Sequence, residues 1–476
     1  MVAKSAKQTT RKRVSWGSYT AFLIAAIGAS IGLGNLWKFP YEAGMHGGGT
    51  FLVVYLPAVL LVAFPLMIAE LMLGRLGQSN PIFTLRQLAN ARRLSTLWQS
   101  IGWLGILTSM IVFSYYSVVA GWTLFYIMNS VAGAFENMPA EIVQNSFGAL
   151  LKNTEQLLLW HSVFVLTVVL VLSRDIRRGL EIAMRILMPI FIGGLVWLMF
   201  TVADIGNMPA AMEFMFTVRW EFLTLDLFVS AIAQALFSMS IGIGIIMMYG
   251  SYMSDHRPLF GAAAVITFFD TAIALVMSIL IFSIVFAFGL RPDSGPGLIF
   301  ETLPVAFSQM HDNSILISTV FFVFMFAAAL FSGFALLEPS IAWIIDRFEM
   351  RRRQAAWLVG SIVWFLGTLS VLSFSDSRMT TSSDTGFSWG FSFYYFGTER
   401  TDGYFDFFSI LTTHVFIPFT ALLLAIFAGW RITRSEAIAA LNVKPGLRFR
   451  MWRLGTRFIA PILLALVLAA VLFIPA

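Results

Sequence analysis

Two apolar stretches of this sequence are interrupted by glycine and polar residues, where an unbroken membrane helix would carry leucine or valine. The first is residues 28–35, which hold three glycines and Asn35, and the second is residues 238–244. Glycine weakens a helix, and a broken helix exposes N–H groups for a carboxylate and carbonyl groups for a cation. Both stretches are therefore candidate binding segments, although close packing of helices also favours such small residues.

Ionisable residues inside apolar stretches are the next candidates, because a charge at membrane depth is costly unless it faces a partner, an ion or a cavity. Asp270 lies between Thr267 and Thr271 on an otherwise apolar stretch, which favours a functional role. Glu70 and Glu338 also lie within apolar stretches. For these two glutamates we favour a structural role, as hydrogen-bonding groups between helices.

Enzyme chemistry finds little support in the sequence. The chain has no cysteine, which excludes disulfides and thiol nucleophiles. The five histidines show no metal-ligand spacing, so each is expected to be a loop or packing residue. A membrane hydrolase with a triad drawn from Ser240, Ser332, Asp270 and His161 is conceivable. We disfavour it because His161 is expected near the membrane surface opposite the broken helices, and no motif indicates an activated nucleophile.

The elements that must position these residues are membrane helices. Of the 476 residues, 58% are hydrophobic and 12% charged, and the mean hydropathy is +0.82. About 20 apolar residues cross a bilayer. Eleven stretches meet this length or approach it, and they predict an all-α membrane protein: 17–40, 51–73, 98–130, 157–173, 180–203, 226–253, 258–290, 314–346, 354–373, 405–429 and 458–475.

The distribution of positive charge orients these helices. With a cytoplasmic N-terminus, all but six of the 31 basic residues fall on the cytoplasmic side. The six are Lys38, Lys152, Arg219, Arg291, Arg378 and Arg400. Basic residues spread over short loops also exclude a nucleic-acid groove. Eleven crossings then place the C-terminus outside, and a bacterial inner membrane is expected.

The two broken helices open two successive groups of five helices with opposite orientation, as an inverted repeat requires. This inference rests on spacing and orientation alone. The predicted organisation is a basic cytoplasmic segment with part of an inner gate, a first five-helix repeat, a second inverted repeat, a basic cytoplasmic loop and an eleventh helix. Their ranges are 1–16, 17–205, 226–430, 431–457 and 458–476.

The segment from Gly32 to Pro40, with its sequence Gly-Leu-Gly-Asn-Leu-Trp-Lys-Phe-Pro, resembles the signature of the neurotransmitter:sodium symporter family, as does the triplet Gly47 to Gly49. The resemblance covers nearly the whole chain and is weakest from about 374 to 404. It implies the LeuT fold, a 5+5 inverted repeat plus one extra helix, with helices 1 and 6 unwound at mid-membrane.

The resemblance also implies a substrate site. Tyr116 and N–H groups near Leu33 and Gly34 would bind a substrate carboxylate, and Phe237 would close over the substrate. Gly32 stands where monoamine carriers have an aspartate, which favours an amino-acid substrate. The implied substrate-binding residues are Ala29, Ser30, Leu33, Gly34, Val112, Tyr116, Val119, Phe237, Ser238, Ser240, Ile243, Ser332 and Leu336.

Ion sites and gates follow from the same resemblance. The first sodium site would use Ser30, Asn35, Ser238 and Asp270, and the second Gly28, Ile31, Ala328 and Ser332. Lys38 and Asp406 would form the outer gate, and Arg13, Trp16, Tyr252 and Asp346 the inner gate.

Three residues depart from the family pattern. Phe331 stands where relatives supply an oxygen ligand to the second sodium ion. Ala274 stands where animal relatives have a serine that helps to hold chloride. Asp270 stands where many relatives have asparagine. We therefore expect one or two sodium ions and no chloride requirement, because Asp270 supplies the negative charge.

The expected function is sodium-coupled import of a neutral, apolar amino acid by alternating access, without enzyme activity. The alternatives are a proton-coupled transporter that uses Asp270, and an amino-acid sensor or channel. The identity of the amino acid and the oligomeric state stay open.

Overall fold

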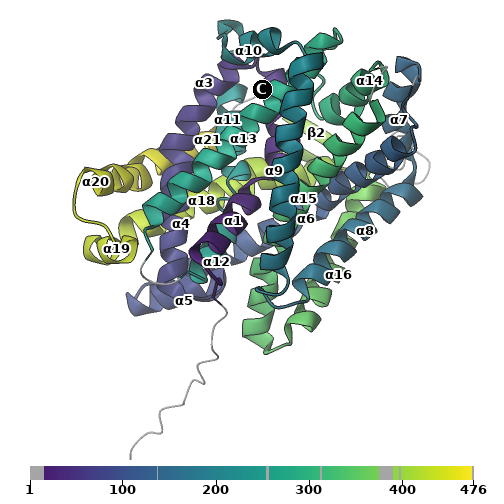
Figure 1. The fold of residues 1–476 in the computed structure, drawn as a ribbon. Coiled ribbons are helices and arrows are strands. Elements are labelled where there is room, and N and C mark those ends of the chain that lie inside the picture. The colour runs from purple at the N-terminus through teal and green to yellow at the C-terminus, as the bar shows by residue number, and fades with distance from the viewer. Residues whose placement is uncertain are drawn as a thin grey trace, which may run out of the picture.

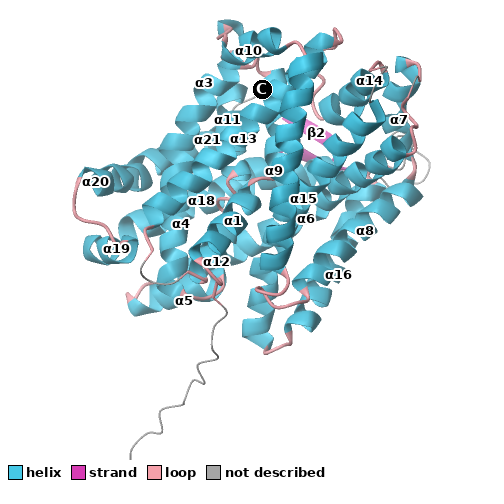
Figure 2. Ribbon diagram, viewed as in Figure 1, coloured by secondary structure: helices cyan, strands magenta, loops and turns pink. Residues whose placement is uncertain are grey.

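The computed structural model describes residues 15–136, 138–253, 257–310, 314–374, 390–395 and 398–473. These residues form a bundle of helices with one pair of strands (Figure 2). Helix α10 lies at one end of the bundle and α5 at the opposite end (Figure 1). The predicted inner-gate residue Arg13 lies outside the described residues.

Within the described ranges, nine helices are long and apolar enough to cross a membrane. Four of them include turns of 3-10 or π helix. Three of these four contain two labelled α helices, and the fourth begins with a 3-10 turn just before its labelled helix. The nine are Gly49–Gly77 (α3, Gly49–Ala58, and α4, Phe64–Gly77), Thr96–Val131 (α6, Ser100–Val131), α8 (Thr154–Leu172), α9 (Leu180–Ile205), α13 (Leu259–Ala287), α15 (Ser314–Phe348), α16 (Arg352–Leu372), Tyr404–Arg431 (α17, Tyr404–Ile410, and α18, Ile417–Ile426) and Leu447–Phe473 (α20, Leu447–Leu454, and α21, Ala460–Phe473).

Shorter helices lie in the connections between the long ones. They are amphipathic or short and contain no long apolar stretch, so the pattern of apolar stretches does not predict them. They are α5 (Pro81–Ala91), α7 (Ala140–Lys152), α10 (Met208–Phe216), α14 (Leu303–Ser308) and α19 (Arg434–Leu441).

The first predicted break is present. Helix α1 (Tyr19–Ser30) begins at Ser18, whose hydroxyl accepts a hydrogen bond from the Ala21 N–H, and ends at Ile31, which has extended dihedral angles. A π turn then leads into α2 (Phe39–Met45), and the two halves bend by 45°. The backbone around residues 31–33 therefore leaves the helical hydrogen-bond ladder.

The second predicted break is present as well. Helix α11 (Leu225–Ser238) stops before residues 239–244, and α12 (Ile245–Ser251) continues beyond them. Ser240, Gly242 and Gly244 all have positive φ, a conformation that glycine adopts without steric cost. The two halves are each too short to cross a membrane. Among the described residues, the nine long helices and the broken α1–α2 span make up to ten candidate crossings, and the broken α11–α12 segment lies at the predicted crossing 226–253.

The all-α fold class is confirmed, and the chain also contains one small hairpin that was not predicted. Strands β1 (Gly390–Tyr395) and β2 (Thr398–Gly403) form an antiparallel hairpin in which Gly390 pairs with Gly403. The first strand is rich in aromatic residues, which favour strands. The hairpin falls in the stretch where the resemblance is weakest.

Helices α6 and α15 pack together along the centre of the bundle, and α1, α9, α8 and α16 pack against one or both of them. Aromatic rings fill the contact between α9 and α15, where Phe191 and Phe324 stack with ring centroids 4.4 Å apart. The first helix break adjoins this closely packed wall, because Gly28 approaches Phe331 on α15.

Candidate functional site

The centre of the candidate site is Asp270, a fully buried residue of α13 that lies between the two helix breaks. Its Oδ1 atom accepts hydrogen bonds from Asn35 Nδ2 at 2.9 Å and from Ser238 Oγ at 2.7 Å. Asn35 Nδ2 also lies 2.9 Å from the Asp270 carbonyl oxygen. The structure thus brings together three of the four residues predicted for the first sodium site, to which Ser30 was expected to contribute its carbonyl.

Asp270 Oδ2 and the hydroxyls of Tyr55 and Thr271 have no hydrogen-bond partner among the described residues, and all three oxygen atoms are buried. A buried carboxylate oxygen without a partner is costly, and a hard cation prefers oxygen ligands. The chemistry of this donor set therefore fits sodium. The hydroxyl of the fourth predicted residue, Ser30, bonds locally to the Ile27 carbonyl.

Tyr116 joins α6 to the break in the first helix. Its hydroxyl donates to the Ala329 carbonyl at 3.2 Å and accepts from the Leu33 N–H at 3.4 Å. Gly32 faces the same point, and a Cβ atom there would overlap the Ser332 hydroxyl and lie 3.1 Å from the Tyr116 hydroxyl. No side chain fits at Gly32 in this arrangement.

Two predicted serines bridge the broken segments. Ser240 donates to the Ala29 carbonyl at 3.1 Å. Ser332 on α15 donates to the Ala29 and Ile31 carbonyls over long distances of 3.4 Å and 3.5 Å. Both serines therefore bond to backbone groups that the first break has released.

Several apolar residues predicted to line the pocket are buried. Val112, Val119, Ile243 and Leu336 each have at most 3% of their surface exposed. They come from α6, the second break and α15.

Phe331 occupies the neighbourhood of the predicted second sodium site. Its ring is fully buried, meets Phe191 edge-on at 5.7 Å, and would lie 3.5 Å from a Cβ at Gly28. The Met184 sulfur would lie 3.2 Å from the same atom. An apolar ring and a thioether therefore stand beside the Gly28 backbone, where relatives supply an oxygen.

At the predicted outer gate, Lys38 Nζ lies over the Phe237 ring, 4.8 Å from its centroid. Its pairing with Asp406 stays a prediction. His46 connects the two broken helices at this end, because its Nε2 lies 3.2 Å from Asp226 Oδ2. Nothing in the sequence pattern indicated this contact.

At the other end of the bundle, Trp16 packs edge-on against Tyr252 at 6.0 Å and its backbone N–H donates to the Tyr252 carbonyl. Two predicted inner-gate residues therefore meet. A third, Asp346, accepts a hydrogen bond from Asn80 Nδ2 at 2.8 Å, and Asn80 also caps α5. Asn80 was missed because its role depends on a loop helix.

Glu338 is the centre of the polar contacts at this end. Its fully buried carboxylate accepts from the Tyr252 hydroxyl at 2.9 Å and from both terminal nitrogens of Arg352 at 3.0 Å and 2.5 Å. The prediction that Glu338 joins helices is confirmed. From the sequence, Arg352 is expected only to be one of the basic residues on the cytoplasmic side. The sequence cannot show that, of Arg351, Arg352 and Arg353, it is Arg352 that turns inward.

Glu70 confirms the other structural prediction. Its carboxylate accepts from the Gly242 N–H at 2.7 Å and from the Met247 N–H at 3.2 Å. Both N–H groups belong to the break between α11 and α12 and its continuation. Glu70 therefore stabilises the unwound backbone by accepting hydrogen bonds that the helix no longer provides.

The expectation that His161 lies near a membrane surface is wrong. The side chain is fully buried, and its ring nitrogens lie 2.9 Å from Ser117 Oγ and 3.2 Å from the Trp364 carbonyl. The hydrolase triad is not assembled, because this histidine joins α8 to α6 and α16. Its role is packing, since Gly121 and Gly367 make room for the close approach of these helices.

Comparison with known proteins agrees with this geometry. The sequence matches the Sodium:neurotransmitter symporter family over residues 13–146 and 135–473. An uncharacterized sodium-dependent transporter of Bacillus subtilis, YhdH, is 29% identical, and the match covers 96% of this chain and 97% of that protein. Sodium-dependent nutrient amino acid transporter 1 of Drosophila mojavensis is 24% identical, with 76% of this chain and 65% of that protein covered.

Among solved structures, a crystal structure of MhsT in complex with L-phenylalanine matches with a TM-score of 0.86 and 33% identity, covering 96% of this chain and 99% of that chain. The predicted LeuT-type fold is thereby confirmed. With the family match, the broken helices and the long apolar helices, it leads to one conclusion. The chain belongs to the sodium:neurotransmitter symporter family and is a multi-pass, sodium-dependent membrane transporter.

Proposed function

We propose that this protein couples the import of a neutral, apolar amino acid to the entry of sodium by alternating access. The observation that carries the proposal is the buried Asp270 carboxylate between two helix breaks, with one oxygen held by Asn35 and Ser238 and the other without a partner. A sodium ion beside this oxygen would attract a substrate carboxylate, which in turn needs donors.

Those donors are the Tyr116 hydroxyl and backbone N–H groups near Leu33 and Gly34, which face the same space. The zwitterionic end of an amino acid would thus be bound by the breaks, and its side chain would lie among Val112, Val119, Ile243 and Leu336. An apolar lining favours an apolar side chain, because polar groups would lose hydrogen bonds there. The complex of MhsT with L-phenylalanine supports an amino-acid substrate for this chain.

Uptake of radiolabelled amino acids into proteoliposomes tests the proposal. An inward sodium gradient is expected to drive accumulation of at least one apolar amino acid, and a potassium gradient is not. Accumulation driven by a pH gradient without sodium would instead establish the proton-coupled alternative. Sodium-dependent binding without accumulation would indicate a sensor.

A first prediction concerns orientation in a bacterial inner membrane. Lys152 and Lys444 are exposed and fall on opposite sides of the bilayer if the positively charged loops are cytoplasmic. Because the native chain has no cysteine, Lys152→Cys should react with an impermeant maleimide in intact cells, and Lys444→Cys only after permeabilisation. Reaction of both variants from the same side would contradict the helix count.

A second prediction concerns sodium stoichiometry. Phe331→Thr introduces an oxygen beside the Gly28 backbone and is expected to strengthen sodium binding at the second site. A gain of about 1.4 kcal/mol would lower the half-saturating sodium concentration roughly tenfold. Sodium titration of thermal stability measures it. Phe331→Leu, which leaves a cavity but adds no oxygen, is the control, and an equal change in both variants would argue against a ligand effect.

A further inference from the structure

Two arginines of the last long helix lack an anionic partner. Arg453 ends α20, and Arg457 follows one turn later, close enough for their charges to interact. Arg453 Nη2 donates to the Ile432 carbonyl at 2.9 Å. Arg453 Nη1 and Arg457 Nε are buried and have no partner among the described residues. Both side chains are partly exposed, so the two neighbouring guanidinium groups form a basic pair at the surface. An anion from outside the protein could balance their charge.

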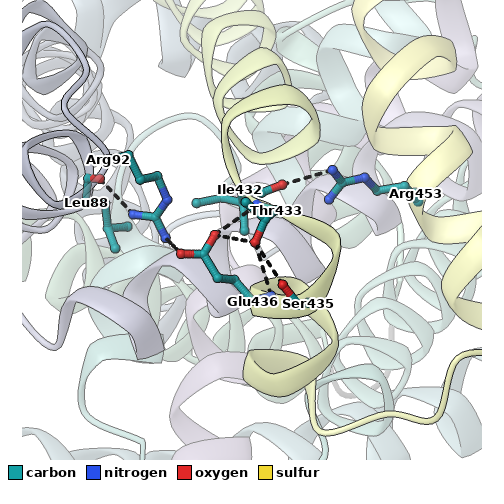
Figure 3. Close-up of polar contacts among 7 residues, drawn as sticks. All are labelled: Leu88, Arg92, Ile432, Thr433, Ser435, Glu436 and Arg453. Carbon is teal, nitrogen blue, oxygen red and sulfur yellow. Dashed lines mark hydrogen bonds and ion pairs between the residues drawn. The ribbon is translucent and has the colours of Figure 1, made fainter.

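Among the described residues, none of the ion pairs joins a carboxylate to this pair. Glu436 is the one acidic residue in the basic segment 431–457, and its Oε1 accepts from Arg92 Nη2 at 2.9 Å. Its Oε2 accepts from the Thr433 N–H at 2.9 Å and the Thr433 hydroxyl at 2.7 Å. In the close-up, the Glu436 carboxylate points toward Arg92 and Thr433, and Arg453 approaches Ile432 from the other side (Figure 3).

The surroundings of the pair are those of a membrane interface. The Arg457 guanidinium lies 4.1 Å from the centroid of the Trp430 ring, and Trp430 is 50% exposed. Leu454 and Phe458 are 53% and 43% exposed, on a helix that continues as a membrane span. Exposed apolar residues and tryptophan beside arginines are typical of the boundary between acyl chains and headgroups.

Two arginines beside exposed apolar residues fit a ligand that has both an anionic group and an apolar part. A phosphodiester offers oxygens for bidentate hydrogen bonds to guanidinium groups, and attached acyl chains would cover Leu454 and Phe458. A free phosphate ion would satisfy the arginines but leave the apolar surface exposed. Juxtamembrane basic residues attract anionic lipids. We propose that Arg453 and Arg457 bind the phosphodiester headgroup of an anionic phospholipid at this end of the last helix.

Thermal unfolding of the purified full-length protein tests the proposal. In nanodiscs of phosphatidylcholine, replacement of part of the lipid by phosphatidylglycerol is expected to raise the unfolding temperature by a few degrees, less so at high ionic strength. In Arg457→Gln, this increase should be lost or at least halved. Arg457 makes no side-chain hydrogen bond within the described structure, so its replacement should leave the fold intact.

Arg448→Gln is the matched control, because Arg448 is an exposed arginine of the same helix, outside the pair. It should retain the full increase. Native mass spectrometry should detect one fewer phosphatidylglycerol bound to Arg453→Gln/Arg457→Gln than to the native protein. An unchanged increase in Arg457→Gln, or an equal loss in Arg448→Gln, would overturn the site. An equal increase from inorganic phosphate alone would overturn the lipid as its ligand.

Discussion

Asp270→Asn is expected to abolish sodium-driven uptake of the amino acid. The substitution retains the size of the side chain and an oxygen for Asn35 and Ser238, but it removes the buried negative charge. Removing one partner of a buried charge pair costs about 2–5 kcal/mol. Sodium affinity should therefore fall by roughly thirtyfold to several thousandfold. Sodium titration of binding and of proteoliposome uptake measures both effects.

The same residue predicts that the native protein does not require chloride. A sodium ion beside a zwitterionic substrate leaves a positive charge that an anion must offset in a medium of low dielectric constant. Asp270 supplies that charge, and the alanine at position 274 offers no hydrogen bond to chloride. Uptake with gluconate in place of chloride should be undiminished in the native protein.

Either of two outcomes would contradict this role of Asp270. One is a strong chloride requirement of the native protein, and the other is sodium-driven uptake by Asp270→Asn at the native rate. Asp293→Asn is a suitable control, because this exposed carboxylate pairs with Arg291 far along the chain from the helix breaks. Its uptake should match that of the native protein.

Glu338→Gln is expected to destabilise the protein by about 3–5 kcal/mol, because it leaves the buried Arg352 charge without its partner. It also weakens the hydrogen bond from the Tyr252 hydroxyl, because an amide oxygen is a weaker acceptor than a carboxylate, and the Tyr252 ring packs against Trp16. The predicted inner gate should therefore open more readily. Thermal unfolding in detergent measures the stability, and labelling of a cysteine introduced at Ser251 measures the opening.

The double variant Glu338→Gln/Arg352→Gln distinguishes the effect of an unpaired buried charge from the effect of the other hydrogen bonds of Arg352. Removing both charges should recover much of the lost stability, because no unpaired charge stays buried. The additional substitution therefore tests the electrostatic cause directly. A double variant less stable than the Glu338→Gln protein would mean that the hydrogen bonds of Arg352 to the Leu172 and Arg174 carbonyls matter more than charge balance.

Much of this protein could be predicted from its sequence because bilayer thickness sets the length of an apolar helix and glycine marks where a helix breaks. The two breaks, the long apolar helices and the convergence of Asn35, Ser238 and Asp270 were all predicted. The β-hairpin after α16 and the short helices such as α5 and α19 were not, because their patterns are short and lack long apolar stretches.

What only the tertiary structure decided is the partner of each buried charge. The sequence alone determined that Glu70 and Glu338 need partners inside the bundle. It did not reveal that Glu70 binds the unwound backbone near Gly242 and that Glu338 binds Arg352. It also did not reveal that Lys38 lies over the Phe237 ring. A hydrogen bond requires atoms within about 3 Å, and that precision depends on how helices distant in sequence pack together.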